Sequence, residues 1–251
     1  MPDIAALFVF PLFLVFCRMG AALFIFPGFS DPSINARARL LAAGGISLML
    51  WPMVAADLPP LPAENAIFVQ LILIELVIGL LMGIAARLLM GALSVAGEMI
   101  AFATGFQAAT LFDPITNSNS TAPSLFLMLV GGVLIFAMNL HHDLIHGVYM
   151  SYQVFPPGQL PPVNDTAQAI INTVQHLFVL GVKMAAPVVV IGFLGYVGFG
   201  IFNRLIPQLH VFFVALPLQI FVGMFVLATS IAIIFTLFVT HMKDRVILFV
   251  Q

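Results

Sequence analysis

The stretch from Asn203 to Gly223 constrains the fold of this chain more than any other. It reads NRLIPQLHVFFVALPLQIFVG and places an arginine, two prolines, two glutamines and a histidine inside an otherwise apolar run. Pro207 and Pro217 lack an amide donor and clash with the preceding turn, so a helix here must start, kink or break. At membrane depth, a broken helix or a guanidinium such as that of Arg204 is tolerated only where protein or water surrounds it. The stretch is therefore predicted to face protein or a wet cavity.

The composition indicates a membrane protein. Hydrophobic residues make up 62% of the 251 residues and charged residues 7%, whereas soluble domains carry about 25% charged residues. The net charge of −2 argues against a nucleic-acid partner, which needs a basic surface. Cys17 is the single cysteine, so an internal disulfide is excluded.

Several apolar runs approach or exceed the roughly 20 residues that a helix needs to cross a bilayer. The runs are Ile4 to Phe26, Leu40 to Val54, Ile67 to Met90, Leu93 to Phe112, Leu125 to Leu140, Leu177 to Phe202 and Val211 to Val239. Some are short and one is long, so the pattern predicts six to eight membrane segments in an all-α fold. No interdomain linker or low-complexity segment divides them. We therefore expect a single domain over residues 1–251.

Glu75, Gly79 and Gly83 form a column on one predicted helix, because residues four apart share a helix face. Small residues at this spacing let a second helix approach closely. The column therefore predicts a packing face on which Glu75 is paired or reaches toward water. Ion transport is the alternative for a carboxylate within the membrane. Further glycines that favour bends or close helix contacts are Gly91, Gly97, Gly105, Gly192, Gly195, Gly198 and Gly200.

The segment HHDLIH is the one metal-like motif in the sequence. His142 and His146 are four residues apart with Asp143 between them, which resembles the H-E-x-x-H motif of zinc proteases. Aspartate is shorter than glutamate and no third ligand is evident, so a polar helix end at the membrane interface is the favoured interpretation. The sequence also contains no nucleophile elbow, Walker or G-x-G-x-x-G pattern. We therefore expect neither enzymatic activity nor a metal or cofactor.

Taken together, these residues resemble the FliR family of flagellar type III export gates, whose injectisome counterparts are the SctT proteins. The most specific match is GFGIFNRLIPQLHVFFVALPLQIFVG, with its small residues followed by N-R, P-Q, an aromatic residue, P-L and glycine. Leu140 departs from the family pattern, which has glycine before the histidine. Further matches are Arg18, Pro27, Arg37, Arg39, Pro52, Glu75, Gly79, Gly83, Ala96-Gly97-Glu98, Gly105-Phe106-Gln107 and Phe112-Asp113-Pro114.

The resemblance implies a non-enzymatic subunit of a protein-conducting gate. Such chains form membrane-associated helical hairpins and assemble with several FliP-like and FliQ-like subunits into a helical export-gate ring, which a FlhB-like protein contacts. The expected location is the bacterial cell inner membrane, within the flagellar basal body, where unfolded export substrates cross. The chain would then be needed for flagellar biogenesis.

The resemblance also implies two sets of functional residues. The segment from Gly105 to Pro123 resembles a plug that helps to close the channel; without the resemblance it would be interpreted as a surface loop joining two helices. The expected plug residues are Gly105, Phe106, Gln107, Leu111, Phe112, Asp113 and Pro114. The expected assembly and packing residues are Glu75, Gly79, Gly83, Glu98, Arg204, Pro207, Gln208, Phe212, Pro217 and Gly223.

Three alternatives stay open at this point. The chain could be an injectisome SctT subunit rather than a flagellar one. A secondary transporter would also use broken helices and intramembrane charges, but it would have an internal repeat, and the break near Arg204 has no counterpart in the first half of the sequence. A metalloprotease built on HHDLIH would require bound zinc.

Overall fold

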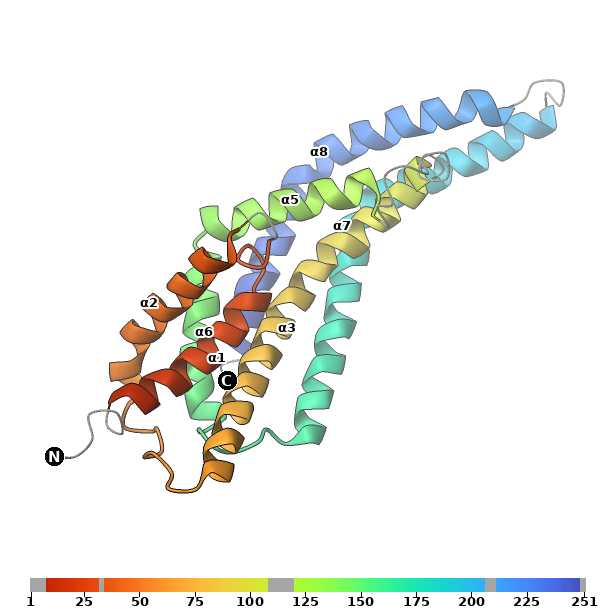
Figure 1. Ribbon diagram of the computed structural model, residues 1–251. Helices are drawn as coiled ribbons and strands as arrows, with labels where there is room; N and C mark the ends of the chain where they lie inside the picture. The colour runs from red at the N-terminus through yellow and green to blue at the C-terminus, as the bar shows by residue number, and fades with distance from the viewer. Residues whose placement is uncertain (1–7, 32–33, 108–119, 206–210, 249–251) are drawn as a thin grey trace. The chain divides into compact units, whose positions relative to one another are not determined.

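The chain folds into α-helices, as predicted. The computed structural model describes residues 8–31, 34–107, 120–205 and 211–248, with side chains left out at 211–214 and 245–248. All regular structure in these ranges is helical. The helices are α1 (Phe10–Ile25), α2 (Ala36–Val54), α3 (Asn65–Thr104), α5 (Ala122–Ala137), α6 (Leu140–Val154), α7 (Val163–Leu205) and α8 (Val211–Leu248) (Figure 1).

The prediction of separate membrane segments at Ile67 to Met90 and Leu93 to Phe112 is wrong for the described residues, because α3 is one helix of 40 residues that contains the first run and continues through the second as far as Thr104. The sequence between them contains Gly91 but no proline, and a glycine inside a helix costs only about 1 kcal/mol. At 1.5 Å per residue α3 is about 60 Å long, twice the roughly 30 Å of a bilayer core.

The predicted six to eight membrane segments are also too many for the described part of the chain. There, α3, α7 and residues Ala215–Asp244 of α8 are long and apolar enough to cross a membrane. The bent pair α5 and α6 adds a fourth candidate if it counts as one span. The bend between them is 73° and lies where Asn139 adopts the left-handed conformation, with a φ of 58°. The apolar α1 has 16 residues and is shorter than a typical span.

The chain divides into two compact units that share several helices. The first unit contains Met1–Leu89, Val133–Val174 and Met242–Gln251, and the second contains Met90–Gly132 and Gln175–His241. The helices α3, α5, α7 and α8 each contribute residues to both units. The expectation of one domain over the whole chain stays a prediction.

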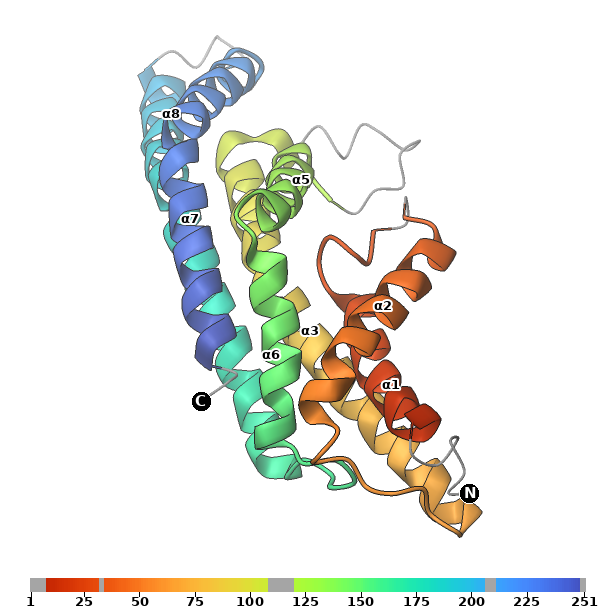
Figure 2. The same ribbon diagram turned by 90° about the vertical axis from the view of Figure 1, so that its left-hand side faces the viewer.

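In the first unit, α1 and α2 form an antiparallel hairpin (Figures 1 and 2). Most of α1 is buried, and Leu14, Met19, Ala22 and Leu23 have no exposed surface. Asn35 is the N-cap of α2, and its Oδ1 accepts a hydrogen bond of 3.0 Å from the Arg37 amide. Because most of its residues are buried, α1 is the core element of this unit.

The helix α1 packs on the Glu75, Gly79 and Gly83 face of α3. A Cβ atom on Gly79 would collide with the Arg18 carbonyl oxygen, and one on Gly83 would lie 2.8 Å from the Ile25 Cβ. Real Cβ atoms do not approach other atoms this closely. Both glycines are therefore required for the observed spacing between α1 and α3.

In the second unit, the C-terminal part of α3 contacts α5, α7 and α8, and a glycine lies at each contact. Gly97 of α3 faces Ser124 of α5, and Gly223 of α8 faces Thr104 of α3. On α7, Gly181 faces Val95 and Gly192 faces Ala103, both of α3. The close packing around the end of α3 thus depends on glycines, which have no side chain to hold the helices apart.

The stretch from Asn203 to Gly223 does interrupt the helices. The helix α7 ends at Leu205 and α8 begins at Val211, while Pro207 lies outside the described residues. Pro217 lies inside α8, and Pro187 lies inside α7, where each removes one backbone hydrogen bond. The two helices form a hairpin around the interruption (Figure 1).

Candidate functional site

A buried ion pair joins α1 to α3 in the first unit. The Arg18 Nε donates to Glu75 Oε2 at 2.6 Å, and Nη2 donates to Oε1 at 3.0 Å. Neither side chain has any exposed surface. Two parallel N–H···O bonds are the strongest arrangement that a guanidinium and a carboxylate make. The pair therefore fixes the rotation of α1 relative to α3.

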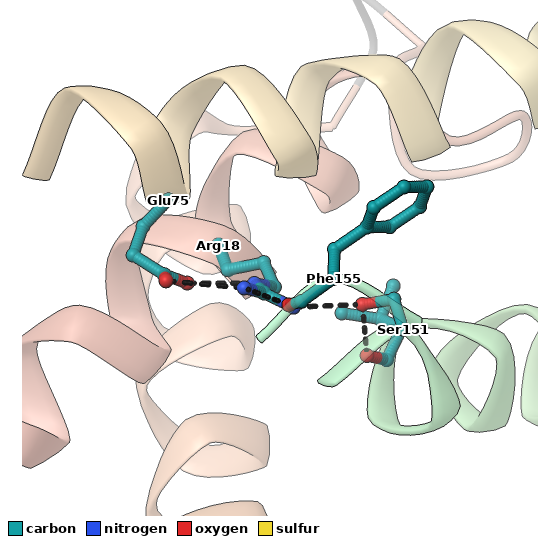
Figure 3. A network of polar contacts seen from close by, with 5 residues as sticks. Arg18, Glu75, Ser151 and Phe155 are labelled. Carbon is teal, nitrogen blue, oxygen red and sulfur yellow. Dashed lines mark hydrogen bonds and ion pairs between the residues drawn. The ribbon is translucent and has the colours of Figure 1, made fainter. Parts of the chain in front are cut away.

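The same guanidinium also binds the end of α6. Its Nη1 donates to Ser151 Oγ at 3.1 Å, and its Nη2 donates to the Phe155 carbonyl oxygen at 3.1 Å (Figure 3). The Arg18 Cζ lies 3.8 Å from the centre of the Tyr152 ring, within the range of a cation–π interaction. A cation beside the last turn of a helix also interacts favourably with its dipole. Arg18 thus connects three helices.

Sequence reasoning identified Glu75 as a residue that is paired or reaches toward water, but it did not assign Arg18 as its partner. The signal was present, since Arg18 and Glu75 carry opposite charges in two apolar runs, and an intramembrane charge is nearly always paired. The geometry is that of a structural connection and shows no reacting group. The assembly role of Glu75, Gly79 and Gly83 stays a prediction.

The first residues of the predicted plug lie at the end of α3 in the second unit. Gly105 follows Thr104 with a φ of 78°, a left-handed conformation that commonly ends helices. Phe106 borders an apolar cavity of about 320 Å³. Its other lining residues are Ala122, Pro123 and Phe126 of α5 and Met224, Leu227, Ala228 and Ile231 of α8. Gln107 is exposed, and Leu111, Phe112, Asp113 and Pro114 lie outside the described residues.

Glu98 of α3 binds the far end of the same segment. Its Oε1 accepts hydrogen bonds of 3.2 Å from both the amide and the hydroxyl of Thr121. Beside it, the Ser94 and Ser124 hydroxyls lie 3.4 Å apart. Sequence reasoning placed Glu98 among the packing residues without finding Thr121. The segment that begins at Gly105 is thus attached to α3 at both of its ends.

The remaining predicted assembly residues lie around the α7–α8 hairpin. Arg204 is exposed at the end of α7, where it makes no ion pair or hydrogen bond to another described residue. Pro217 is exposed on α8, and Gly223 packs on α3. Pro207, Gln208 and the Phe212 side chain lie outside the described part. The assembly role of these residues stays a prediction.

The HHDLIH motif lies in the first turns of α6. His142 and His146 are exposed, and the rings of His141 and His142 stack with centres 4.1 Å apart. In the described ranges, no group of three or more His, Cys, Asp or Glu side chains is arranged to hold a metal ion.

The chain matches known proteins over most of its length. The family model of bacterial export proteins, family 1, matches residues 9–244. The flagellar biosynthetic protein FliR of Caulobacter vibrioides is 37% identical over 219 residues, which cover 87% of each chain. The proteins of the same name from Bacillus subtilis and Aquifex aeolicus are 32% and 29% identical, over 90% and 94% of this chain and 88% and 91% of their own. The chain therefore belongs to the FliR family of bacterial export proteins.

Proposed function

We propose that this chain is a non-enzymatic subunit of the flagellar type III protein export gate. The observation that carries the proposal is the similarity to flagellar biosynthetic FliR proteins over nearly the full length of both partners. In this function the chain lines a protein-conducting channel together with FliP-like and FliQ-like subunits. A FlhB-like protein contacts the assembly in the inner membrane, at the flagellar basal body, and unfolded substrates pass through it.

The surface of the chain supports a place inside a larger complex. Only 33%, 33% and 22% of the positions in the most apolar windows of α3, α7 and α8 are buried within the chain. Arg87 of α3 and Lys183 of α7 are nevertheless exposed in the middle of their helices. A charge on a lipid-facing helix surface is costly, so neighbouring subunits or a wet channel suit these cations better than lipid.

Purification of the complex tests this function. The tagged chain, extracted in mild detergent, should co-purify with FliP-like and FliQ-like subunits, as identified by mass spectrometry, and deletion of its gene should abolish motility. The Arg204→Ala variant should recover less of both subunits, because Arg204 is exposed and is proposed to pack against them. Reproducible recovery of the chain alone, or normal motility of the deletion strain, would contradict the proposal.

The same experiment separates the flagellar function from the injectisome alternative. If the tagged chain co-purified with injectisome subunits, and if cells lacking its gene still swam but failed to secrete proteins, the chain would be SctT-like. The comparisons favour the flagellar assignment because the relatives described above are all named flagellar proteins.

We further propose that the segment after Gly105 helps to close the resting channel. An apolar constriction can block ions by dewetting, and Phe106 and its cavity supply an apolar base for such a closure. Deleting residues 107–117 should raise the uptake of small solutes in cells that still assemble the complex. Deleting the nine residues of the Pro-rich turn at 56–64 should impair folding without leakage through an assembled gate. A deletion of 107–117 that assembles and stays tight would refute the plug role.

A further inference from the structure

Some of the terminal backbone carbonyl groups of α3 accept hydrogen bonds from residues at the same end of the chain segment. The final carbonyl groups of a helix have no partner within the helix. Here the Thr104 hydroxyl donates to the carbonyl oxygens of Ile100, at 2.8 Å, and Ala101, at 3.3 Å. The Gly105 amide donates to the Phe102 carbonyl oxygen at 3.2 Å. The carbonyl of Ala103 still needs a donor from elsewhere.

The α7–α8 hairpin supplies that donor and one more. The Gln219 Nε2 of α8 donates to the Ala103 carbonyl oxygen at 2.7 Å. The Tyr196 hydroxyl of α7 donates to the Phe102 carbonyl oxygen at 3.2 Å. Gln219 is only 8% exposed, so water does not readily replace its hydrogen bond. Each arm of the hairpin therefore binds one terminal carbonyl of α3.

The two arms use the same local design. On α7, Gly192 approaches Ala103 closely and Tyr196 follows four residues later; on α8, Gln219 precedes Gly223, which contacts Thr104. Residues four apart lie on one helix face. On each arm a glycine thus brings the backbones together, and a polar side chain one turn away donates to the end of α3. Such a repeated pairing indicates a specific connection rather than an incidental contact.

We infer that Gln219, together with Tyr196, is a positioning residue that couples the α7–α8 hairpin to the point where the chain leaves α3. This inference rests on the proposed function, in which the segment after Gly105 helps to close the channel. A displacement of the hairpin must either carry the end of α3 with it or break both hydrogen bonds. The closed state therefore depends on contacts with α8 as well as on the plug residues themselves.

Hydrogen exchange tests the coupling independently of export. In the Gln219→Met variant, which keeps the length of the side chain but cannot donate, the amides of residues 102–105 should exchange about tenfold faster. Tyr196→Phe should increase the exchange rate less, because the Phe102 carbonyl oxygen still accepts the hydrogen bond from the Gly105 amide. The matched controls are Gln175→Met and Tyr149→Phe, whose side chains make no hydrogen bond within the described residues. Equal exchange at 102–105 in Gln219→Met and Gln175→Met would overturn the inference.

Solute leakage in the assembled complex tests the consequence for closure. Gln219→Met should co-purify normally with the other subunits and admit small solutes several-fold faster than Gln175→Met. A Gln219→Met complex that assembles and remains as tight as its control would overturn the inference while leaving the proposed function intact. If the proposed function itself were wrong, the unaltered chain would purify without FliP-like and FliQ-like subunits, or cells lacking its gene would swim normally.

Discussion

An Arg18→Met variant is expected to lose about 3–5 kcal/mol of folding stability, because it leaves a carboxylate buried without its partner. Glu75 has no exposed surface, and the Arg18 guanidinium supplies both of its hydrogen bonds among the described residues. The variant also removes the donors to Ser151 and Phe155. Thermal unfolding in detergent and the amount of protein in membranes measure the loss.

The double variant Arg18→Met/Glu75→Leu should be more stable than Arg18→Met alone. Replacing both members of a buried pair by apolar residues is often close to neutral, so the two effects should not add and a double-mutant cycle should give a large coupling energy. Arg87→Met is the matched control because Arg87 is exposed, and its effect should stay within about 0.5 kcal/mol. Additive effects of the two single substitutions would show that the pair does not act as a unit.

A Gly79→Ala variant is expected to lose about 1–3 kcal/mol, the usual cost of overpacking. Its new methyl group would collide with the Arg18 carbonyl oxygen and lie 2.8 Å from the Ala21 Cβ. Backbone atoms cannot rotate away, so α1 must move from α3. That movement would also lengthen the hydrogen bonds between Arg18 and Glu75.

Gly45→Ala should change the folding stability in the opposite direction. Gly45 lies inside α2, is exposed, and has nothing within 4 Å of an added Cβ. Alanine favours a helix over glycine by up to about 1 kcal/mol, so this variant should be slightly more stable. The same unfolding assay compares the two. Equal effects of Gly79→Ala and Gly45→Ala would mean that the contact between α1 and α3 does not limit stability.

Patterns local to the sequence predicted the fold class and placed three residues of α3 on one helix face. The all-α fold follows from long apolar runs, and residues Glu75, Gly79 and Gly83 share a face because of helix periodicity alone. Segment boundaries were less predictable. A glycine interrupts a hydropathy pattern without interrupting a helix, so two predicted runs became the single helix α3. Pro187 likewise lies within α7 without ending it.

Partners distant in the sequence could not be predicted from periodicity. Arg18 and Glu75 are 57 residues apart, and Gln219 lies 116 residues from the carbonyl that it binds. Each pairing depends on how helices pack, which no local pattern specifies. Sequence reasoning could say only that charges in apolar runs need partners, so it singled out Glu75 and Glu98 without assigning Arg18 to the first or Thr121 to the second.

The connections of Arg18 also impose an order on biosynthesis. Its carboxylate partner is translated 57 residues later, and Ser151 133 residues later. At roughly 5–20 residues per second, the ribosome needs about 3–11 s to supply Glu75 and longer to supply α6. During that interval the nascent α1 carries an uncompensated cation in an apolar segment. Its final docking must therefore wait for α3 and α6, although α1 is the first of these helices to be made.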